Sequence, residues 1–458
     1  MIHPLRIKNI HFVGVGGIGM SALALVLHEW GFAVTGSDLQ ESEVTAMLTR
    51  AGIRVQHSHD VALVKEADAV VYSSAVAPDN AELRFAAGRK LRVMKRAVLL
   101  GEVMRSCRTV CVAGTHGKTT TTAMISAIFV QAGQAPTIVA GGMLKHLNSN
   151  AIVGNGKVMI AEADEYDRSF LSMAPTYALV TNIEREHLDC YANLQEVQHA
   201  FREFVCKVPF YGVVVCNADD AATRNLAARV TQPTVLYGEH HSSDYRISEV
   251  TISTCGSQWH VQAENGQAGR LEIGMPGRHN ISNATAAAAL ALEYGIPLST
   301  IREALGGYRG VRRRFDILGK KEDVTVIDDY AHHPTEVAAT IAAAREAGYG
   351  RIVAVFQPHL YTRTRDFAAE FGAALSTADS VFVTEIYRAR EEPLANVSGR
   401  DILDEMQTGG PAGRFVDAGE NLIEMVRERV RPGDAVLFMG AGTITAAAHD
   451  FFRELSNA

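Results

Sequence analysis

The chain has 458 residues, which is too long for one hydrophobic core and predicts about three domains. Hydrophobic residues make up 47% of it and charged residues 21%, the balance of an ordinary soluble globular protein, and a net charge of −7 without a long basic run argues against nucleic acid as a main partner. No uninterrupted apolar segment reaches about 18 residues, so we expect no membrane insertion. The chain start lacks a signal-peptide pattern and the six cysteines form no C-x-x-C pair, which favours reduced thiols in the cytoplasm.

The first segment, residues 1–107, alternates strand-like and helix-like patterns. Apolar runs at 10–13, 32–35, 69–72 and 91–94 predict strands, and residues 20–30 predict a helix. This alternation is typical of a parallel, doubly wound α/β sheet of the Rossmann-like kind. The same class is expected again further along the chain.

A glycine loop follows the first predicted strand of this segment. Its glycines fit G-x-G-x-x-G, and an acidic residue closes the next strand, which on pattern alone predicts NAD and an oxidoreductase. A UDP-sugar also carries a pyrophosphate and a ribose, so it satisfies the same requirements, and a purely structural glycine turn is a third interpretation. The candidate ligand-binding residues here are Gly14, Gly16, Gly17, Gly19, Met20, Ser21 and Asp38.

The second segment, residues 108–314, begins with a phosphate-binding pattern. A β-branched run at 109–112 predicts a buried strand, AGTHGKTTTT follows at 113–122, and residues 124–130 predict an apolar helix. Backbone N–H groups and the positive end of a helix dipole would surround an anion there, although the loop is shorter than the usual G-x-x-x-x-G-K-[ST] pattern. The alternative is a glycine-rich turn with a surface lysine. The candidate nucleotide-binding residues are Gly114, Thr115, His116, Gly117, Lys118, Thr119 and Thr120.

Acidic residues follow the next predicted strand, residues 158–161. The run Glu162-Ala-Asp-Glu-Tyr-Asp167 places four acids at a strand end, which suits Mg²⁺ because that ion prefers oxygen ligands. A solvated acidic loop is the alternative. The strand predicted at 177–181 is followed by a segment containing His187, which is either a metal or phosphate contact or a structural histidine.

The rest of this segment and the third segment, residues 315–458, supply further sheets. Short alternating runs at 246–252, 258–262 and 270–273 predict a small added antiparallel sheet, and an alanine-rich helix begins near Gly277 and Asn280. Strands predicted at 324–327, 351–356, 380–384 and 435–438 indicate another doubly wound sheet. Ligands should gather at the carboxyl ends of such strands, where DDYAHHPTE and QPHLYTRTR stand. A helix cap with incidental histidines is the alternative for the first of these.

The motifs together resemble the Mur ligases. They are GVGGIGMS, AGTHGKTTTT, EADEYD, TNIEREHLD, GRHNISNA, RRRFD, DDYAHHPTE and FQPHLYTRT, in this order along the whole chain. The resemblance implies three domains: a UDP-sugar domain at 1–107, an ATP domain at 108–314 and an amino-acid domain at 315–458. It is greatest to the members that join L-alanine to UDP-N-acetylmuramate in peptidoglycan biosynthesis, with ATP and Mg²⁺ required and a monomer or homodimer expected.

The resemblance also implies roles for single residues. Thr119, Glu162 and His187 would contact the metal; His279, Asn280 and Asn283 would face the adenine, and Asp329 the ribose. Catalysis would depend on Lys118 and Arg314 at the phosphates and on His332 and Arg363 at the incoming L-alanine. Some family members have an arginine where this chain has Leu360, which is a departure at the amino-acid site.

Other functions remain open at this point. Within the family, a recycling ligase attaches a preformed tripeptide to the same UDP-sugar. Folylpolyglutamate synthetase shares the ATPase core but should lack the N-terminal UDP-sugar domain. From other classes, an NAD-dependent dehydrogenase and an ATP-driven binding protein without ligation are the rivals.

Overall fold

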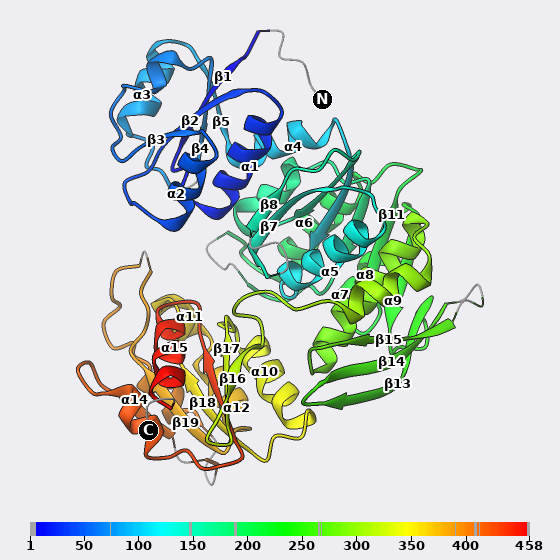
Figure 1. The fold of residues 1–458 in the computed structure, drawn as a ribbon, viewed down its shortest axis with the longest axis vertical. Coiled ribbons are helices and arrows are strands. Elements are labelled where there is room, and N and C mark those ends of the chain that lie inside the picture. Colours follow the sequence, from blue (N-terminus) through cyan, green and yellow to red (C-terminus); the bar gives the residue numbers. More distant parts are fainter. Residues whose placement is uncertain are drawn as a thin grey trace. The chain divides into compact units, whose positions relative to one another are not determined.

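The computed structural model describes residues 6–73, 75–145, 149–186, 190–263, 266, 268–389, 391–406, 410–411 and 413–455. The chain forms two compact units. The first comprises residues 1–248, 260–270 and 282–308, and the second comprises residues 249–259, 271–281 and 309–458. The described strands belong to three sheets, which follow one another along the chain (Figure 1).

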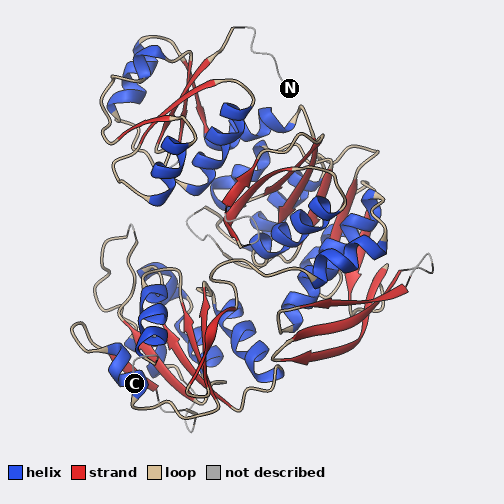
Figure 2. Cartoon of the chain, viewed as in Figure 1, coloured by secondary structure: helices blue, strands red, loops and turns tan. Residues whose placement is uncertain are grey.

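The first sheet has five parallel strands in the order β3-β2-β1-β4-β5, and helices lie on both sides of it (Figure 2). The strands are β1 (Asn9–Val13), β2 (Ala33–Ser37), β3 (Arg54–Gln56), β4 (Ala69–Tyr72) and β5 (Arg92–Lys95). The helices are α1 (Ile18–Glu29), α2 (Glu43–Arg50), the 3₁₀ turn η1 (Val64–Glu66), α3 (Ala81–Gly88) and α4 (Arg96–Met104). The four predicted strands are confirmed, and the chain reverses direction across the sheet between β1 and β4, where ligands bind in such folds.

A buried carboxylate ties this sheet to α3. Glu82 and His11 are both 0% exposed, and His11 Nε2 lies 2.8 Å from Glu82 Oε1. The other carboxylate oxygen accepts from Ser37 Oγ at 2.7 Å and lies 2.7 Å from His59 Nδ1. Because a buried carboxylate needs such partners, the cluster fixes the end of β2 immediately before Asp38.

The second sheet has ten strands in the order β15-β14-β13-β12-β11-β10-β6-β9-β7-β8. The strands are β6 (Arg108–Ala113), β7 (Thr137–Leu144), β8 (Ser149–Ile152), β9 (Val158–Glu162), β10 (Tyr177–Val180), β11 (Val213–Asn217), β12 (Thr234–Gly238), β13 (Tyr245–Ser253), β14 (Gly256–Ala263) and β15 (Ala268–Ile273). Its central strands are apolar, buried and parallel, and β8 pairs antiparallel with β7. The predicted added strands β13 to β15 extend this sheet, since β12 pairs with β13 at Tyr237–Tyr245 and Gly238–Arg246.

The helices connected to this sheet are α5 (Lys118–Gln131), the 3₁₀ segment η2 (Tyr166–Ser172), α6 (Leu194–Val205), α7 (Ala221–Ala227), α8 (Arg278–Tyr294) and α9 (Leu298–Gly306). The predicted helix after the phosphate-binding pattern is α5, and it begins at the lysine itself. The predicted alanine-rich helix is α8. Among the described helices, none is both long and apolar enough to cross a bilayer.

The third sheet lies in the second unit and has the order β16-β17-β21-β18-β19-β20. Its strands are β16 (Asp316–Lys321), β17 (Val324–Asp329), β18 (Arg351–Phe356), β19 (Ser380–Thr384), β20 (Gly413–Val416) and β21 (Asp434–Met439). Its helices are α10 (Pro334–Glu346), α11 (Tyr361–Asp366), α12 (Ala368–Leu375), α13 (Arg400–Asp404), α14 (Leu422–Arg427) and α15 (Ile444–Glu454). The edge strand β16 runs antiparallel to β17, and the other neighbouring strands are parallel. The predicted strands are confirmed.

Candidate active site

The phosphate-binding pattern forms a tight turn between β6 and α5. Gly114 has φ +137° and Gly117, which caps α5, has φ +81°. A Cβ at Gly114 would lie 1.9 Å from Thr181 Oγ1, so only glycine fits beside the end of β10. The turn therefore presents the unpaired N–H groups of a helix N-terminus at the carboxyl end of a buried strand, which is an anion-binding arrangement.

Residues after β10 hold this loop in place. His116 N–H donates to Asn182 Oδ1 at 2.8 Å, and Thr115 N–H donates to the Asn182 carbonyl at 3.0 Å. Thr181 Oγ1 donates to the His116 carbonyl at 2.6 Å. These bonds span more than sixty residues of sequence, so the loop is pre-organised by its neighbouring strand.

Lys118 lies inside the loop. Its Nζ donates to the Gly114 carbonyl at 2.6 Å and to Glu165 Oε2 at 2.8 Å, and the Glu165 side chain is only 2% exposed. Burial disfavours the ammonium, but the charges of Glu165, Asp164 and Glu186 outweigh it and raise the pKa of Lys118 above its ordinary value. Lys118 is therefore a permanently charged cation at this turn.

Two oxygen-bearing residues suited to a divalent cation meet next to the lysine. Thr119 Oγ1 donates to Glu162 Oε1 at 2.6 Å, and Gly141 N–H donates to Glu162 Oε2. Burial raises the pKa of Glu162, and the hydrogen bond from Thr119 opposes that rise. A hydroxyl and a buried carboxylate satisfy the oxygen preference of Mg²⁺. His187, the third predicted metal contact, lies outside the described residues.

The start of α8 contributes one residue to this loop. A Cβ at Gly117 would lie 2.6 Å from Asn283 Oδ1, so the Asn283 amide packs against the phosphate turn. Thr120, in the first turn of α5, is buried. In the second unit, Asn280 Nδ2 donates to the Pro276 carbonyl at 2.8 Å, so its side chain fastens the helix start.

The predicted ribose and amino-acid residues gather at the carboxyl ends of β17 and β18. Asp329 is buried and accepts from Phe315 N–H at 2.7 Å and from Ala331 N–H at 2.8 Å. The His332 ring lies 5.8 Å from the His359 ring, and Arg363 Nη1 lies 3.2 Å from His359 Nδ1. His359 thus connects the two residues predicted for L-alanine.

Arg314 and His332 share one carboxylate. Arg314 Nη1 lies 3.5 Å from Glu336 Oε1, and His332 Nδ1 lies 3.1 Å from Glu336 Oε2. The guanidinium of Arg314 also lies over the Tyr330 ring, 5.1 Å from its centroid. Leu360 precedes α11 with φ +70°, which places an apolar side chain where the family resemblance suggested an arginine.

The glycine loop after β1 is closed by Asp38. Asp38 Oδ2 accepts from Gly16 N–H at 2.8 Å, and its Oδ1 accepts from Gln40 N–H at 3.1 Å. Gly14 has φ +78°, and a Cβ at Gly19 would lie 2.8 Å from Arg96 Nη1. A guanidinium therefore lies beside the loop, which suits a pyrophosphate.

The other predicted members of this site belong to the start of α1. Met20 and Ser21 are buried, and Ser21 Oγ donates to the Ile18 carbonyl at 2.9 Å. Gly17 caps the helix with φ −64°. The two residues therefore belong to the helix start, where their N–H groups donate to the Gly17 carbonyl at 3.0 and 2.9 Å.

Comparison with known proteins identifies the family. Profiles described as "Mur ligase family, catalytic domain", "Mur ligase middle domain" and "Mur ligase, glutamate ligase domain" match residues 9–108, 112–291 and 313–442. The chain belongs to the Mur ligase family.

Relatives extend this result over nearly the whole length. The UDP-N-acetylmuramate–L-alanine ligase of Anaeromyxobacter dehalogenans is 46% identical over 442 residues, 96% of each chain. The solved UDP-N-acetylmuramate-alanine ligase of Thermotoga maritima superposes with a TM-score of 0.81 at 32% identity, covering 99% of this chain and 100% of that one. A murein peptide ligase of Psychrobacter arcticus has a TM-score of 0.69 at 25% identity, covering 98% and 99%.

The three sheets are therefore those of the three-domain Mur ligase fold, with a mixed central sheet and mainly parallel sheets on either side in sequence. Five residues that shape the candidate site were given no individual role from the sequence, although four of them stand inside its motifs. Glu165, Asn182, Glu336 and His359 contact the predicted residues through the bonds given above, and Arg96 lies at the glycine loop. Each stands just after a strand end or in the first turn of a helix, and this position is the sequence signal that could have assigned it a role.

Two buried groups of the second unit should give this Mur ligase opposite pH dependences of folding. Burial lowers the pKa of His279 from 6.5 to about 4 and raises that of Asp329 from 3.8 to about 6. Between pH 4 and 6.5 the unfolded state binds a proton on His279 and the folded state does not, so the free energy of unfolding decreases as pH falls. Between pH 3.8 and 6 the folded state keeps a proton on Asp329 that the unfolded state has released, so this group's contribution to the free energy of unfolding decreases as pH rises. Each contribution is about 3 kcal/mol.

We therefore expect the two contributions to offset one another in the unmodified chain. His279→Gln should become less stable relative to it as pH rises from 4.5 to 6.5, and Asp329→Asn should become more stable. Urea unfolding at four pH values in this range measures both slopes. If the free energy of unfolding of the two variants changed with pH in the same direction relative to the unmodified chain, the pKa shifts assigned to His279 and Asp329 would be wrong.

Proposed function

We propose that this chain joins L-alanine to the carboxylate of UDP-N-acetylmuramate in peptidoglycan biosynthesis, converting ATP to ADP and phosphate. The observation that carries the proposal is the 46% identity, over 96% of both chains, to a protein named UDP-N-acetylmuramate–L-alanine ligase. The site geometry supports it, because one chain contains a pyrophosphate-type glycine loop, a triphosphate-type loop and a cluster of histidine and arginine side chains at the third sheet.

ATP is needed because a carboxylate resists attack by an amine. It is anionic, and its leaving group would be oxide. Transfer of the γ-phosphoryl group to the muramoyl carboxylate makes an acyl phosphate, from which phosphate leaves readily. Lys118 would exchange its present bond to Glu165 for the phosphate oxygens and stabilise the charge that spreads over them during transfer. Arg314 would act on the same phosphates.

The residues around Lys118 fit a magnesium ion. Thr119 and Glu162 would hold it, with His187 as a further proposed contact, and Mg²⁺ would supply charge neutralisation at the phosphates. Thr119 and Glu162 are hydrogen-bonded to each other, so metal binding would replace that bond. Burial disfavours the charged form of Glu162 and raises its pKa, so a bound cation would stabilise the carboxylate.

The amine then attacks the acyl carbon, and phosphate departs. Arg363 would pair with the carboxylate of L-alanine, for which its planar donors are suited. His332, held by Glu336 at 3.1 Å, would orient the ammonium and take its proton. The adenine is proposed to contact His279, Asn280 and Asn283, and the ribose Asp329; burial keeps His279 neutral with a pKa of about 4.

Two alternatives are less well supported. The murein peptide ligase has lower identity and a lower TM-score than the alanine ligase, which disfavours tripeptide addition. For a dehydrogenase, the Asp38 carboxylate should be free to bind a ribose diol, yet both of its oxygens accept backbone N–H groups. We further propose domain limits of 1–107, 108–314 and 315–458, and a monomer or homodimer acting in the cytoplasm, with no nucleic-acid partner.

Product analysis tests the reaction. With Mg²⁺ and ATP, the purified chain should release ADP and phosphate only when both UDP-N-acetylmuramate and an amine are present. In a panel of L-alanine, glycine, L-serine and a stem tripeptide, L-alanine should give the highest kcat/KM. Release of AMP and pyrophosphate would contradict the acyl-phosphate mechanism, and turnover with the tripeptide alone would favour the recycling ligase.

A further inference from the structure

An exposed aromatic pair stands on the loop between α6 and β11. Phe210 is 89% exposed and Tyr211 is 67% exposed, the two highest fractions among the large hydrophobic residues that the structure describes. Their ring centroids are 5.2 Å apart in an edge-to-face arrangement, so they form one projecting unit. Such side chains on a loop tip gain nothing from the core of their own chain and mark a contact surface.

The loop lies at the amino-terminal edge of the central sheet. Tyr177 of β10 pairs with Val213 of β11 and with Val110 of β6, so the residues just before these strands lie side by side. Arg108 opens β6, and its N–H donates to the Lys157 carbonyl at 2.8 Å. Arg108 on β6 therefore lies on this edge two strands away from β11, and Lys157, just before β9, lies three strands away.

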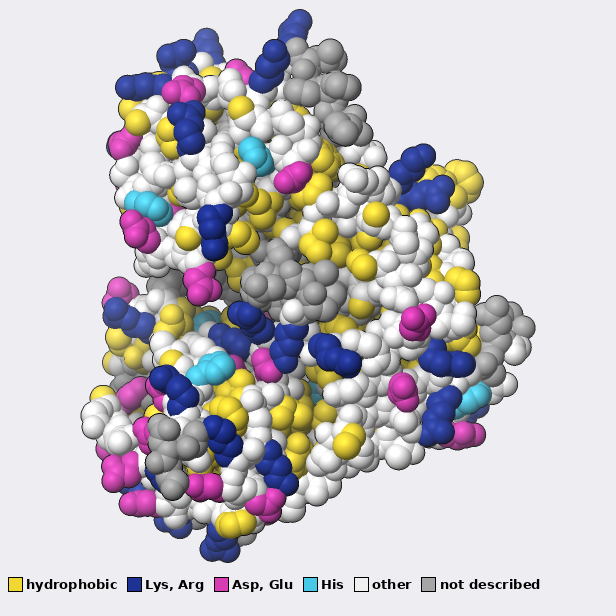
Figure 3. Space-filling view, viewed as in Figure 1, with side chains coloured by type: hydrophobic (Ala, Val, Ile, Leu, Met, Phe, Trp, Pro, Cys, Tyr) yellow, Lys and Arg dark blue, Asp and Glu magenta, His cyan; other side chains and the backbone are white. Residues whose placement is uncertain are grey.

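Basic side chains stand near the ends of the elements that meet this edge. They are exposed and, among the described residues, none has an ion pair: Arg105, Arg108, Lys157, Arg202 and Arg229. Lys207 lies 4.0 Å from Glu203, and Glu293 nearby accepts from Tyr245 Oη at 2.5 Å. Figure 3 shows dark blue Lys and Arg side chains beside yellow ones at the upper right, near the position of β11 in Figure 1. The edge thus combines aromatic rings with positive charge.

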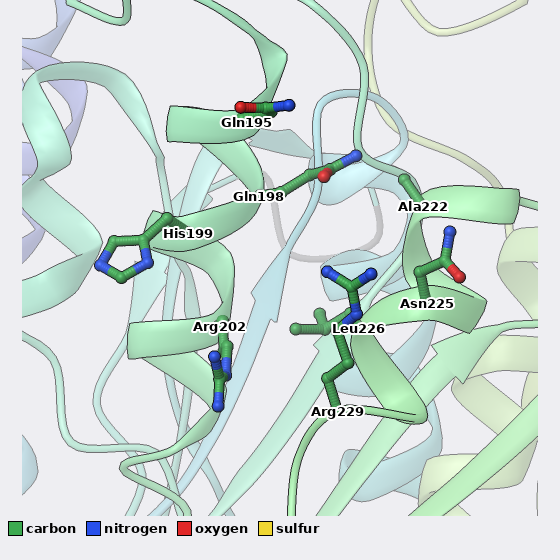
Figure 4. A pocket seen from close by; sticks show the side chains of 8 residues that line it. All are labelled: Gln195, Gln198, His199, Arg202, Ala222, Asn225, Leu226 and Arg229. Atoms are coloured by element: carbon green, nitrogen blue, oxygen red, sulfur yellow. The ribbon is translucent and has the colours of Figure 1, made fainter.

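A cavity between two helices shares two basic residues with this edge, Arg202 and Arg229. It measures about 400 Å³ and lies between α6 and α7. Gln198 and Arg202 line it from α6, and Leu226 and Arg229 from α7 and the residues after it (Figure 4). Gln232 Nε2 donates to the Cys206 carbonyl at 3.1 Å, and this bond links the segment after α7 to the C-terminal end of α6. The guanidinium groups of Arg202 and Arg229 in this lining suit a phosphate group on a lipid.

The nucleotide loop stands at the opposite edge of the sheet. Gly114 follows the last residue of β6 and Arg108 is its first, so a six-residue strand of about 20 Å separates them. A binding partner that contacts the edge with the aromatic pair would leave the phosphate loop uncovered. The edge is therefore free to serve binding without obstructing the reaction.

We propose that this edge, defined by the Phe210–Tyr211 pair and the five basic residues listed above, docks the enzyme on an anionic lipid bilayer. Rings of this kind favour the interfacial zone, and Lys and Arg are attracted to acidic headgroups. A second copy of the chain is a poorer occupant, because a two-fold contact through this edge would bring the same basic residues together. The docking is peripheral and is independent of which amine the enzyme ligates.

Vesicle sedimentation of the full chain tests the proposal. Vesicles of phosphatidylglycerol and phosphatidylcholine in a 1:3 ratio should bind the protein at 50 mM salt, and binding should be lost at 500 mM salt or with pure phosphatidylcholine. Phe210→Ser with Tyr211→Ser, and separately Arg108→Gln with Arg229→Gln, should each weaken binding about tenfold or more. Arg400→Gln with Arg414→Gln removes the same charge from exposed positions elsewhere and should leave binding unchanged.

Ligation measured without vesicles should be the same in all these variants, which shows that they fold. Absence of binding by the unmodified chain at low salt would overturn the proposal, as would equal binding to both lipid compositions. Analytical ultracentrifugation tests the alternative that this edge forms a dimer interface. A dimer that the Phe210→Ser, Tyr211→Ser chain no longer forms would show that this edge joins two copies instead.

Discussion

Replacing Lys118 by alanine should lower ligation by at least about 10³-fold while UDP-N-acetylmuramate still binds. The ammonium is the one cation whose Nζ lies within the phosphate turn among the described residues, bonded to the Gly114 and Thr115 carbonyls. Loss of a charge that stabilises phosphoryl transfer has effects of this size. The glycine loop that is proposed for the UDP-sugar belongs to another sheet. Steady-state kinetics and calorimetry with each ligand measure the two effects.

Folding must be separated from catalysis in this test. Lys118→Ala leaves Glu165 buried without its cation, which costs about 3–5 kcal/mol in comparable buried pairs. The double variant Lys118→Ala, Glu165→Gln removes that unpaired charge and should recover stability but not activity. Lys320→Ala, an exposed lysine of the second unit, is the matched control and should behave as the unmodified chain. Loss of both ligands together in a folded Lys118→Ala chain would refute the assignment of two separate sites.

The sequence predicted the parts of the fold whose signals are local. Buried central strands such as β9 and β18 are continuous β-branched and apolar runs, so they could be located within one or two residues. The edge strands β3, β16 and β20 were missed because they are short or polar and gain their order from a neighbouring strand. The strands β13 to β15 were predicted, but their continuity with the central sheet depends on a two-residue pairing to β12 that no local pattern encodes.

The candidate site shows the same division. Gly114, Gly117 and Lys118 were predictable because a strand, a turn and a helix start stand next to one another in the sequence. The carboxylate that Lys118 binds was not, since Glu162 and Glu165 occur in one acidic run and only the fold assigns one to Thr119 and the other to the lysine. The partnership of Asn182 with the loop and of His359 with Arg363 and His332 likewise arises from adjacent strand ends that are distant in sequence.

Gly16→Ala should weaken UDP-N-acetylmuramate binding by about 100-fold and leave ATP binding within a factor of two. A Cβ at this position would lie 2.7 Å from Asp38 Oδ2 and 3.2 Å from Thr45 Cγ2. Neither neighbour is free to retreat. Asp38 accepts from Gly16 and Gln40 N–H groups, and Thr45 exchanges hydrogen bonds with Ser42 at the start of α2. The loop itself must therefore move, at a cost of about 1–3 kcal/mol.

The size of this loss distinguishes a ligand-binding loop from a structural turn. Gly88→Ala is the matched control, because a Cβ there meets nothing within 4 Å and the residue lies in the same part of the chain at the end of α3. The overpacking should lower the unfolding midpoint of Gly16→Ala by several degrees relative to Gly88→Ala, while both variants stay folded at the temperature of the titration. Calorimetric titration with UDP-N-acetylmuramate should then separate them by the full factor. Equal affinities in two folded variants would mean that the pyrophosphate does not contact the Gly14–Gly19 turn, and the hydrogen bond of Gly16 with Asp38 would be purely architectural.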